Sequence, residues 1–159
     1  MDRFFSQSIS RTWAWAGAAL ALSSAHTSAT AQPDECRAVS THQIEKLFDD
    51  WNQALQTNDP GKVVALYADG STLLPTLHAR PRLTRAEKLE YFEKFLQLKP
   101  VGKIDEGWVD IGCNSAVRAG LYTFDLEDGR AIKARYTFTY EYRDGEWKIT
   151  SHHSSLLPP

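Results

Sequence analysis

The chain has 159 residues and a formal net charge of −2, with 18 basic side chains against 20 acidic ones. This length suits one ordinary domain, and no cluster of lysine or arginine stands out along it. We therefore expect neither nucleic acid nor a membrane surface as a partner, because binding to either needs a concentrated basic surface.

The first 31 residues have the pattern of a bacterial-type signal peptide. Arg3 and Arg11 precede a short apolar run over residues 13–22, and small residues follow. The motif Ala29-Thr30-Ala31 fits the Ala-x-Ala rule for cleavage by signal peptidase. The apolar run has about half of the roughly 20 residues that a membrane-spanning helix needs. We therefore expect cleavage after this motif, export to the periplasm or the medium, and one mature domain over residues 32–159.

Two cysteines lie in the mature part of the chain, Cys36 and Cys113. An even pair in an exported protein favours a disulfide. The closed loop would be long, and the chain-entropy model then gives a stabilisation on the order of 4 kcal/mol. Two alternatives remain open, namely a lipid anchor on Cys36 and two unconnected buried thiols. Residues 33–35 are unlike the small apolar residues that precede a lipid-attachment site.

Helical patterns fill the first half of the mature domain. Residues 40–43 have the form of a capping box and precede apolar residues at spacings of three and four. These apolar residues are Ile44, Leu47, Phe48, Trp51 and Leu55. Asp59 and Pro60 predict the N-cap and first residue of a short second helix. A strand is expected over 71–77, and a second capping box at 84–87 predicts a third helix.

The second half alternates between apolar and polar residues and is rich in aromatic and β-branched side chains. This pattern predicts four strands, over residues 103–111, 115–126, 131–142 and 146–155. Asp128-Gly129 and Asp144-Gly145 separate the last three strands and are typical of tight hairpin turns. Helices followed by an antiparallel meander predict an α+β fold, with the helices packed on one face of a curved sheet.

Alternation along the last two strands indicates which side chains face the helices. One set in the third of these strands is mostly aromatic and has to be buried. This set is Ile132, Ala134, Tyr136, Phe138, Tyr140 and Tyr142. In the last strand, Trp147 and Ile149 point inward by the same argument. Strict alternation then turns His153 inward and His152 outward.

Two strand faces are left open by the pattern. In the strand 115–126, either the set that contains Arg118 and Tyr122 or the alternate set can face the helices. The outward set of the strand 131–142 carries threonines among charged residues. Such a face suits either solvent or a neighbouring subunit.

Six short motifs in the last 70 residues follow one another in an order that resembles a known family. They are residues 91–96 (YFEKFL), 102–105 (GKID), 120–124 (GLYTF), 134–138 (ARYTF), 143–147 (RDGEW) and 152–155 (HHSS). From about Thr41 to Pro158 the chain resembles the bacterial relatives of the association (hub) domain of calcium/calmodulin-dependent protein kinase type II. That family is part of the nuclear transport factor 2-like superfamily.

The resemblance implies a cone, in which a strongly bent sheet is wrapped by three N-terminal helices and a pocket opens between them. It also implies homo-oligomers, usually dimers through the sheet face, with larger rings in animal hubs. The sequence contains no glycine-rich phosphate loop, no His-Arg-Asp catalytic loop and no Asp-Phe-Gly. We therefore expect no kinase activity from this chain itself.

The resemblance and the strand faces together give a set of candidate pocket residues. The set is Trp51, Tyr67, Tyr91, Arg118, Tyr122, Tyr136, Phe138 and His153. Core packing alone also accounts for most of these aromatic side chains. Animal hubs place arginines deep in the pocket at the positions of Tyr122 and Phe138, so a pocket for acids does not carry over directly. Arg118 either replaces those arginines or faces outward.

His153 is the best candidate for chemistry. A histidine that faces a pocket can act as a general acid, a general base or a hydrogen-bond donor to a ligand, or it can be a core histidine. His152 points to the other face of the strand, so the pair makes no metal site, and we expect neither a metal nor a cofactor. Asp105 and Asp110 lack the apolar surroundings that a carboxylate base of the isomerase type needs.

The sequence thus predicts an exported, disulfide-linked homo-oligomer, for which a homodimer is the expected state. Its expected role is to bind a small organic molecule or to serve as an assembly module, without kinase activity. The alternative is a small lyase or isomerase of the ketosteroid isomerase or polyketide cyclase type, with His153 as its acid or base.

Overall fold

The computed structural model describes residues 35–158, so the expected signal peptide lies outside the described residues. The elements are α1 (Thr41–Gln56), α2 (Pro60–Val64), β1 (Tyr67–Leu74), α3 (Arg85–Leu96), β2 (Val101–Gly112), β3 (Ser115–Asp125), β4 (Ala131–Arg143) and β5 (Glu146–Leu156). This is the order of helices and strands that the sequence predicts. None of the helices in this part of the chain is long and apolar enough to cross a membrane.

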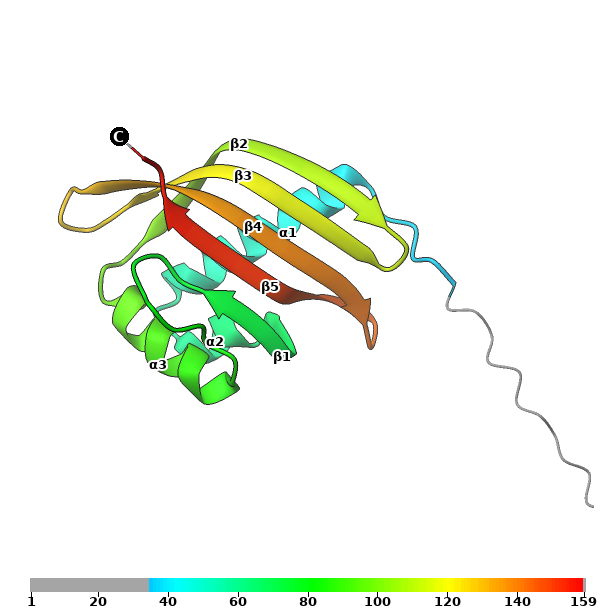
Figure 1. Cartoon of the computed structure of the whole chain (residues 1–159), viewed down its shortest axis with the longest axis horizontal. Helices are drawn as coiled ribbons and strands as arrows, with labels where there is room; N and C mark the ends of the chain where they lie inside the picture. The colour runs from blue at the N-terminus through cyan, green and yellow to red at the C-terminus, as the bar shows by residue number, and fades with distance from the viewer. Residues whose placement is uncertain (1–34, 159) are drawn as a thin grey trace, which may run out of the picture. The chain divides into compact units, whose positions relative to one another are not determined.

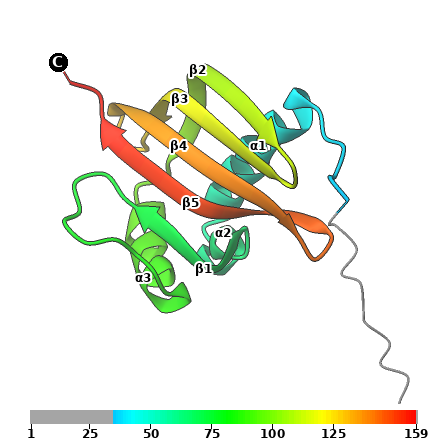
Figure 2. The same ribbon diagram turned by 45° about the vertical axis from the view of Figure 1, so that its right-hand side comes forward.

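The five strands form one sheet in the order β1-β5-β4-β3-β2. Strands β2 to β5 are antiparallel neighbours, whereas β1 joins β5 in parallel. The sheet is curved but not closed, and α1 runs across its concave face (Figure 1). Figure 2 shows α2 and α3 beside β1, at the edge of the sheet opposite to β2. The α+β fold with helices on one face of a curved sheet is confirmed.

Both predicted capping boxes are present. The Ser40 hydroxyl accepts from the backbone N–H of Gln43 at the start of α1, and the Gln43 side chain accepts from the N–H of Ser40. Thr84 and Glu87 make the same pair of bonds at the start of α3. Bonds from the Thr84 and Leu83 N–H groups hold the pKa of the Glu87 carboxyl below its usual value. These local bonds satisfy amide groups that the first helical turn leaves free.

The core lies between α1 and the concave face of the sheet and is mostly aromatic. Trp51 packs edge-on against Phe138 of β4 at 5.5 Å between ring centroids, and Phe48 lies 6.3 Å from Tyr136. Burial alternates along β3 so that Tyr122 and its parity set face the helices. The structure thereby decides the face that the sequence left open on this strand.

A bulge in β5 overturns the predicted orientation of the two histidines. Tyr140 of β4 pairs with Ile149. The residue before it in β4, Thr139, pairs with Ser151, so that Thr150 has no partner. An extra residue of this kind reverses the alternation of all side chains after it. His152 and Ser154 therefore face the helices, and the prediction that His153 points inward is wrong: it is exposed on the outer face.

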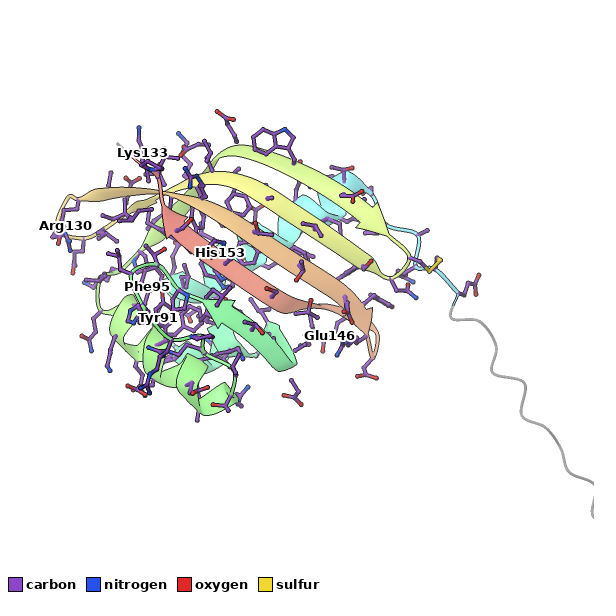
Figure 3. All side chains as sticks on the ribbon, in the orientation of Figure 1. Tyr91, Phe95, Arg130, Lys133, Glu146 and His153 are labelled. Atoms are coloured by element: carbon purple, nitrogen blue, oxygen red, sulfur yellow. A yellow bond between two sulfur atoms is a disulfide. The ribbon has the colours of Figure 1, made fainter. Side chains whose placement is uncertain are left out.

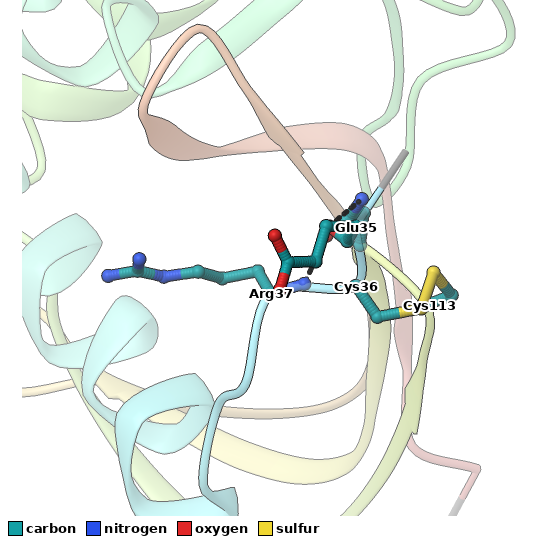
Figure 4. The surroundings of a disulfide bond; sticks show 5 residues. Glu35, Cys36, Arg37 and Cys113 are labelled. Atoms are coloured by element: carbon teal, nitrogen blue, oxygen red, sulfur yellow. Dashed lines mark hydrogen bonds between the residues drawn. A yellow bond between two sulfur atoms is a disulfide. The ribbon is translucent and has the colours of Figure 1, made fainter. Parts of the chain in front are cut away.

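The predicted disulfide joins Cys36 and Cys113, with 4.8 Å between their Cα atoms. It ties the segment before α1 to the turn between β2 and β3 (Figure 4). Asn114 accepts from the backbone N–H of Arg37 at 2.6 Å and donates to the carbonyl of Glu35 at 3.3 Å. The bonded Cys36 has no thiol left to carry a lipid anchor.

Candidate ligand-binding cavity

A cavity of about 410 Å³ opens between α3, the loop that follows β1, and the concave face of β3, β4 and β5. Its inner wall is mostly apolar and aromatic. The apolar lining includes Trp51, Leu73, Tyr91, Phe92, Phe95, Tyr122, Phe124, Ile132 and Ala134. Figure 3 shows two of these side chains, Tyr91 and Phe95, on α3. Small-molecule sites in proteins commonly have this size and composition.

The loop between β1 and α3 forms one rim of the cavity and is held by backbone bonds. Leu73 and Arg82 exchange two backbone hydrogen bonds of 2.8 and 3.0 Å across the loop. The buried ammonium of Lys88 donates to the carbonyls of Ser71 at 2.7 Å and Leu83 at 3.0 Å. Burial lowers the pKa of Lys88. These bonds fix both ends of the loop on the body of the domain.

One group of polar atoms on the cavity wall is a chain of three hydroxyls. The Tyr122 hydroxyl donates to Ser154 Oγ at 2.6 Å, and Ser154 Oγ lies 2.6 Å from Thr76 Oγ1. Burial raises the pKa of Tyr122, so its hydroxyl stays protonated. The chain joins β3, β5 and the rim loop, and a hydroxyl can donate to a ligand or accept from it.

A second chain of bonds ends at His152, which also lines the cavity. Trp51 Nε1 donates to the Tyr67 hydroxyl at 3.2 Å, and this hydroxyl lies 2.9 Å from His152 Nδ1. The imidazole stacks on Phe138, with 3.9 Å between the ring centroids. Burial, and next the nearby His153, lower the pKa of His152 to about 3. His152 is therefore neutral at physiological pH, and its Nε2 is buried without a partner in residues 35–158.

The mouth of the cavity is charged, and most of its charges are paired. Lys94 Nζ lies 2.8 Å from a Glu90 carboxylate oxygen, and Arg130 Nε lies 2.8 Å from an Asp128 oxygen. Arg82 at the rim contacts ring and backbone acceptors rather than a carboxylate. The inner wall thus carries neither a positive nor a negative charge.

The structure gathers only part of the candidate pocket set around the cavity. Trp51, Tyr91 and Tyr122 line it, and these three come from α1, α3 and β3. Tyr67 and Phe138 lie behind His152, which they contact directly. They position a lining residue without being part of the wall.

Arg118 faces the interior but lies away from the cavity, together with Tyr136. Its guanidinium sits over the Phe48 ring at 5.5 Å and donates through Nη1 to the carbonyl of Glu45 at 2.6 Å. Arg118 is only 7% exposed, and this contact with α1 is how its charge is accommodated. It does not replace the pocket arginines of animal hubs, because neither Arg118 nor Tyr136 lines the cavity.

Sequence reasoning missed His152, Ser154 and Thr76. Strict alternation places the first two on the outer face, because no feature of the sequence marks a bulge at Thr150. The Asp144-Gly145 turn fixes the register only up to Ile149. Thr76 follows β1 in a loop, where strand alternation gives no direction.

The cavity is equipped to bind rather than to transfer protons. The one carboxylate in its lining is Glu90 at the mouth, where the Lys94 ammonium lowers its pKa. His152 has no carboxylate partner, and an imidazole that is protonated only near pH 3 is a weak base at neutral pH. Asp105 lies elsewhere and accepts from the Thr123 hydroxyl. Within residues 35–158, no group of three or more His, Cys, Asp or Glu side chains is placed to hold a metal.

The outer face of the sheet carries a second feature, a continuous row across all five strands. The strand register places Leu74, His153, Thr137, Ala119 and Trp108 side by side in that order. We call these five residues the outer row. Trp108 is 62% exposed, which is high for so large an apolar side chain.

The comparisons with known proteins agree with this geometry. The family model of the calcium/calmodulin-dependent protein kinase II association domain matches residues 40–158. None of the curated proteins matches the chain. A solved structure from Xanthomonas campestris, which bears the same association-domain designation, is 43% identical. That match covers 79% of this chain and 96% of the other, with a TM-score of 0.72.

More distant structures share the fold. A nuclear transport factor 2-like protein of unknown function from Pseudomonas putida is 21% identical over 74% of this chain and 89% of its own, with a TM-score of 0.65. A nuclear transport factor 2-like protein from Streptomyces avermitilis, described as a candidate dehydratase, is 13% identical over 74% and 97%, with a TM-score of 0.64. The chain therefore belongs to the calcium/calmodulin-dependent protein kinase II association domain family and has the nuclear transport factor 2-like fold.

Proposed function

We propose that this association domain binds a small, mostly apolar organic molecule in its cavity without transforming it. The observation that carries the proposal is the cavity itself: it has about 410 Å³ and is bounded mostly by apolar and aromatic side chains, with its charged side chains at the exposed mouth. If this region served only as hydrophobic core, side chains would fill the space, because protein interiors are close-packed. The conversion of a ligand would need an acid or base on this wall, and only a neutral histidine and hydroxyls are there.

Native mass spectrometry of gently purified protein tests the proposal with a matched pair of variants. Ile132 lines the cavity, whereas its neighbour Lys133 lies exposed on the other face of β4. We expect wild type and Lys133→Trp to retain an added mass from the host, and Ile132→Trp to lose it because the indole occupies the space. Equal retention by all three proteins, or no added mass in any of them, would contradict the proposal.

We also propose that the mature domain is exported, starting after residue 31. Two facts support this: the signal-peptide pattern in the sequence and the Cys36–Cys113 disulfide, a bond that persists mainly in oxidising compartments. A periplasmic or secreted domain meets small molecules from outside the cell, which fits a binding role.

A second proposed role is self-association through the outer row, most simply as a dimer. The family is that of an association domain, and the outer row presents the exposed Trp108 beside Ala119 on an open sheet face. A two-fold interface needs one surface that complements itself, and a row that crosses the whole sheet can pair with its own copy. An exposed tryptophan is also a common anchor at the centre of such interfaces.

Sedimentation velocity with charged substitutions tests the association. Trp108→Glu should convert the dimer to a monomer, because each subunit would then bury a carboxylate without a partner in the interface. Leu77→Glu is the control, since Leu77 is also exposed but lies at the cavity rim. A dimer that survives Trp108→Glu, or a wild type that is monomeric at micromolar concentration, would rule out this interface.

The lyase or isomerase alternative loses its central residue. His153 is exposed in the outer row, on the opposite side of the sheet from the cavity. His152 faces inward instead of His153, and its neutral side chain is hydrogen-bonded to Tyr67 rather than to a carboxylate. No observation in the cavity favours catalysis over binding.

A further inference from the structure

We infer that the ligand of the cavity is an anionic amphiphile, such as a fatty acid, whose apolar body fills the cavity while its acidic head group stays at the mouth against Arg82, Lys94 and Arg130. The inference rests on the proposed binding function and specifies its ligand class. It depends on which charged side chains line the mouth, on how firmly they are already paired, and on how the apolar lining continues to the surface.

Three cations from separate parts of the chain converge at the mouth. Arg82 lies in the loop before α3, Lys94 on α3 and Arg130 in the turn between β3 and β4, and all three line the cavity. Figure 3 shows Arg130 on that turn. Among the described residues that line the cavity, Glu90 is the one carboxylate, so a head group at the mouth meets more positive than negative charge. The sequence shows no basic cluster because these residues come together only in the fold.

The existing ion pairs at the mouth leave two of these cations available. Lys94 pairs with Glu90 one helical turn away, and the two side chains are 70% and 68% exposed. Arg130 and its partner Asp128 are also more than half exposed, and Asp128 does not line the cavity. Ion pairs as exposed as these contribute little to stability. Their cations can therefore turn to a ligand at small cost.

Arg82 is the third cation, and it belongs to none of the ion pairs of residues 35–158. Its guanidinium contacts the carbonyl of Arg80 at 3.4 Å and the ring of His78 at 3.3 Å. The nearby Glu87 is occupied by the capping box of α3 and lies outside the cavity lining. Burial raises the pKa of Tyr91 on the cavity wall to about 12, and the charge of Arg82 acts in the opposite direction. The positive charge of Arg82 thus reaches into the cavity.

The apolar lining continues from the inner wall to the surface. Leu77, Leu98 and Leu156 line the cavity and are 86%, 39% and 42% exposed. A wholly neutral apolar ligand would fill this path but gain nothing from the cations at the mouth, and a cationic ligand would face them. An acid drawn fully inside would lose its water against a wall without a cation. An amphiphile with its acid at the mouth avoids each of these costs.

Probes that share one apolar chain and differ in the head group test the inference by isothermal titration calorimetry of the full mature chain. We choose octanoate, 1-octanol and octylammonium, and add butyrate as an acid with a short body. Octanoate should bind roughly tenfold more tightly than 1-octanol, the ratio that about two exposed ion pairs provide, and octylammonium should bind most weakly of these three. The tenfold ratio should fall toward one at high salt, which screens exposed charges. Butyrate should bind roughly hundredfold more weakly than octanoate, because most of the affinity comes from buried methylene groups.

Charge-removing variants assign the preference to the mouth. Arg82→Gln and Arg130→Gln should each lower the octanoate-to-octanol ratio by roughly two- to fivefold. Glu90→Gln should raise it, because the remaining charges of the lining are all positive. Lys133→Gln is the matched control, because it removes an equal charge close to Arg130 in the sequence but lies exposed on the other face of β4 and outside the cavity lining. It should leave the ratio unchanged. If Arg82→Gln does not fold, Arg130→Gln in its exposed turn provides the same readout.

The outcomes separate the inference from the function on which it rests. Equal binding of octanoate and 1-octanol leaves cavity binding in place and overturns the role of the mouth cations. A preference for octylammonium, butyrate as tight as octanoate, or a tenfold ratio that survives the loss of all three cations overturns the inference as well. If none of the four probes binds, the proposed binding function itself fails.

Discussion

His152 shows how one buried side chain links the fold to the cavity. It stacks on Phe138, shares a hydrogen bond with the Tyr67 hydroxyl and stays neutral because protonation would place an unpaired charge in an apolar site. The same burial must cost stability when the solution becomes acidic.

The pH dependence of unfolding measures this cost. The pKa of His152 is about 3 in the folded protein and about 6.5 in the unfolded chain. Between these pH values the unfolded chain binds a proton that the folded protein does not, so the free energy of unfolding falls as the pH decreases. The contribution is roughly 1 kcal/mol per pH unit inside this window and vanishes above it.

Urea unfolding of wild type, His152→Gln and His153→Gln from pH 7.5 to pH 4 tests this expectation. His152→Gln should be the least pH-dependent protein, whereas His153→Gln should keep most of the wild-type dependence, because burial is the larger cause of the lowered pKa of His152 and His153 the smaller one. The carboxylates contribute equally to all three proteins and cancel in the comparison. If His152→Gln and His153→Gln had the same slope, His152 would not be a buried neutral histidine.

At the scale of elements, three register shifts interrupt the described sheet, and two of them lie in its antiparallel part, where they shape the strands around the core. The register of β2 shifts between Ile104 and Glu106, beside Gly120 of β3. The other irregularity is the bulge at Thr150 of β5, which brings His152 inward. Bulges increase the local bend of a strand and re-aim its side chains, so both contribute to a sheet that curves around α1.

Gly120 is the residue that allows the first of these irregularities. A Cβ atom at this position would lie 2.0 Å from the carbonyl oxygen of Glu106 and 2.9 Å from the Cα of Gly107, both of them backbone atoms. We expect Gly120→Ala to lower the free energy of unfolding by about 2–3 kcal/mol, because the backbone of β2 or β3 has to move to make room for the methyl group. Thr123→Ala on the same strand should cost less than about 1 kcal/mol. Equal losses in urea unfolding would show that β2 does not approach β3 this closely.

The elements themselves were predictable from sequence because their signals are local. Local signals that act over a few residues include the capping boxes at Ser40 and Thr84 and the Asp144-Gly145 turn. In β4, the aromatic side chains alternate along the strand, so only one face of the strand can be the buried one. The orientation of His152 was not predictable from sequence, because the bulge at Thr150 depends on how β5 pairs with β4 and β1, which are distant along the chain. The part of the cavity wall between Pro75 and Arg82 likewise depends on a loop without periodicity.

At the scale of the whole molecule, one sheet presents two separate surfaces. Its concave face carries the cavity and His152, and its outer face carries the outer row with His153. Consecutive residues of β5 thus belong to different proposed roles, and each role can be removed without the other. The family fold thus serves as the scaffold, and the side chains that line the cavity in this chain are the ones that the proposed ligand would contact.

The most direct measurement of the central claim is an NMR titration of the mature domain with acetophenone, a small and mostly apolar probe, following the backbone amides. We predict saturable shifts that gather at the cavity lining, around Thr76, Tyr122, Ile132 and His152, with the outer row unchanged. No saturable shift, or shifts centred on Trp108 and the outer face, would contradict the account, because the cavity would then be empty space rather than a binding site.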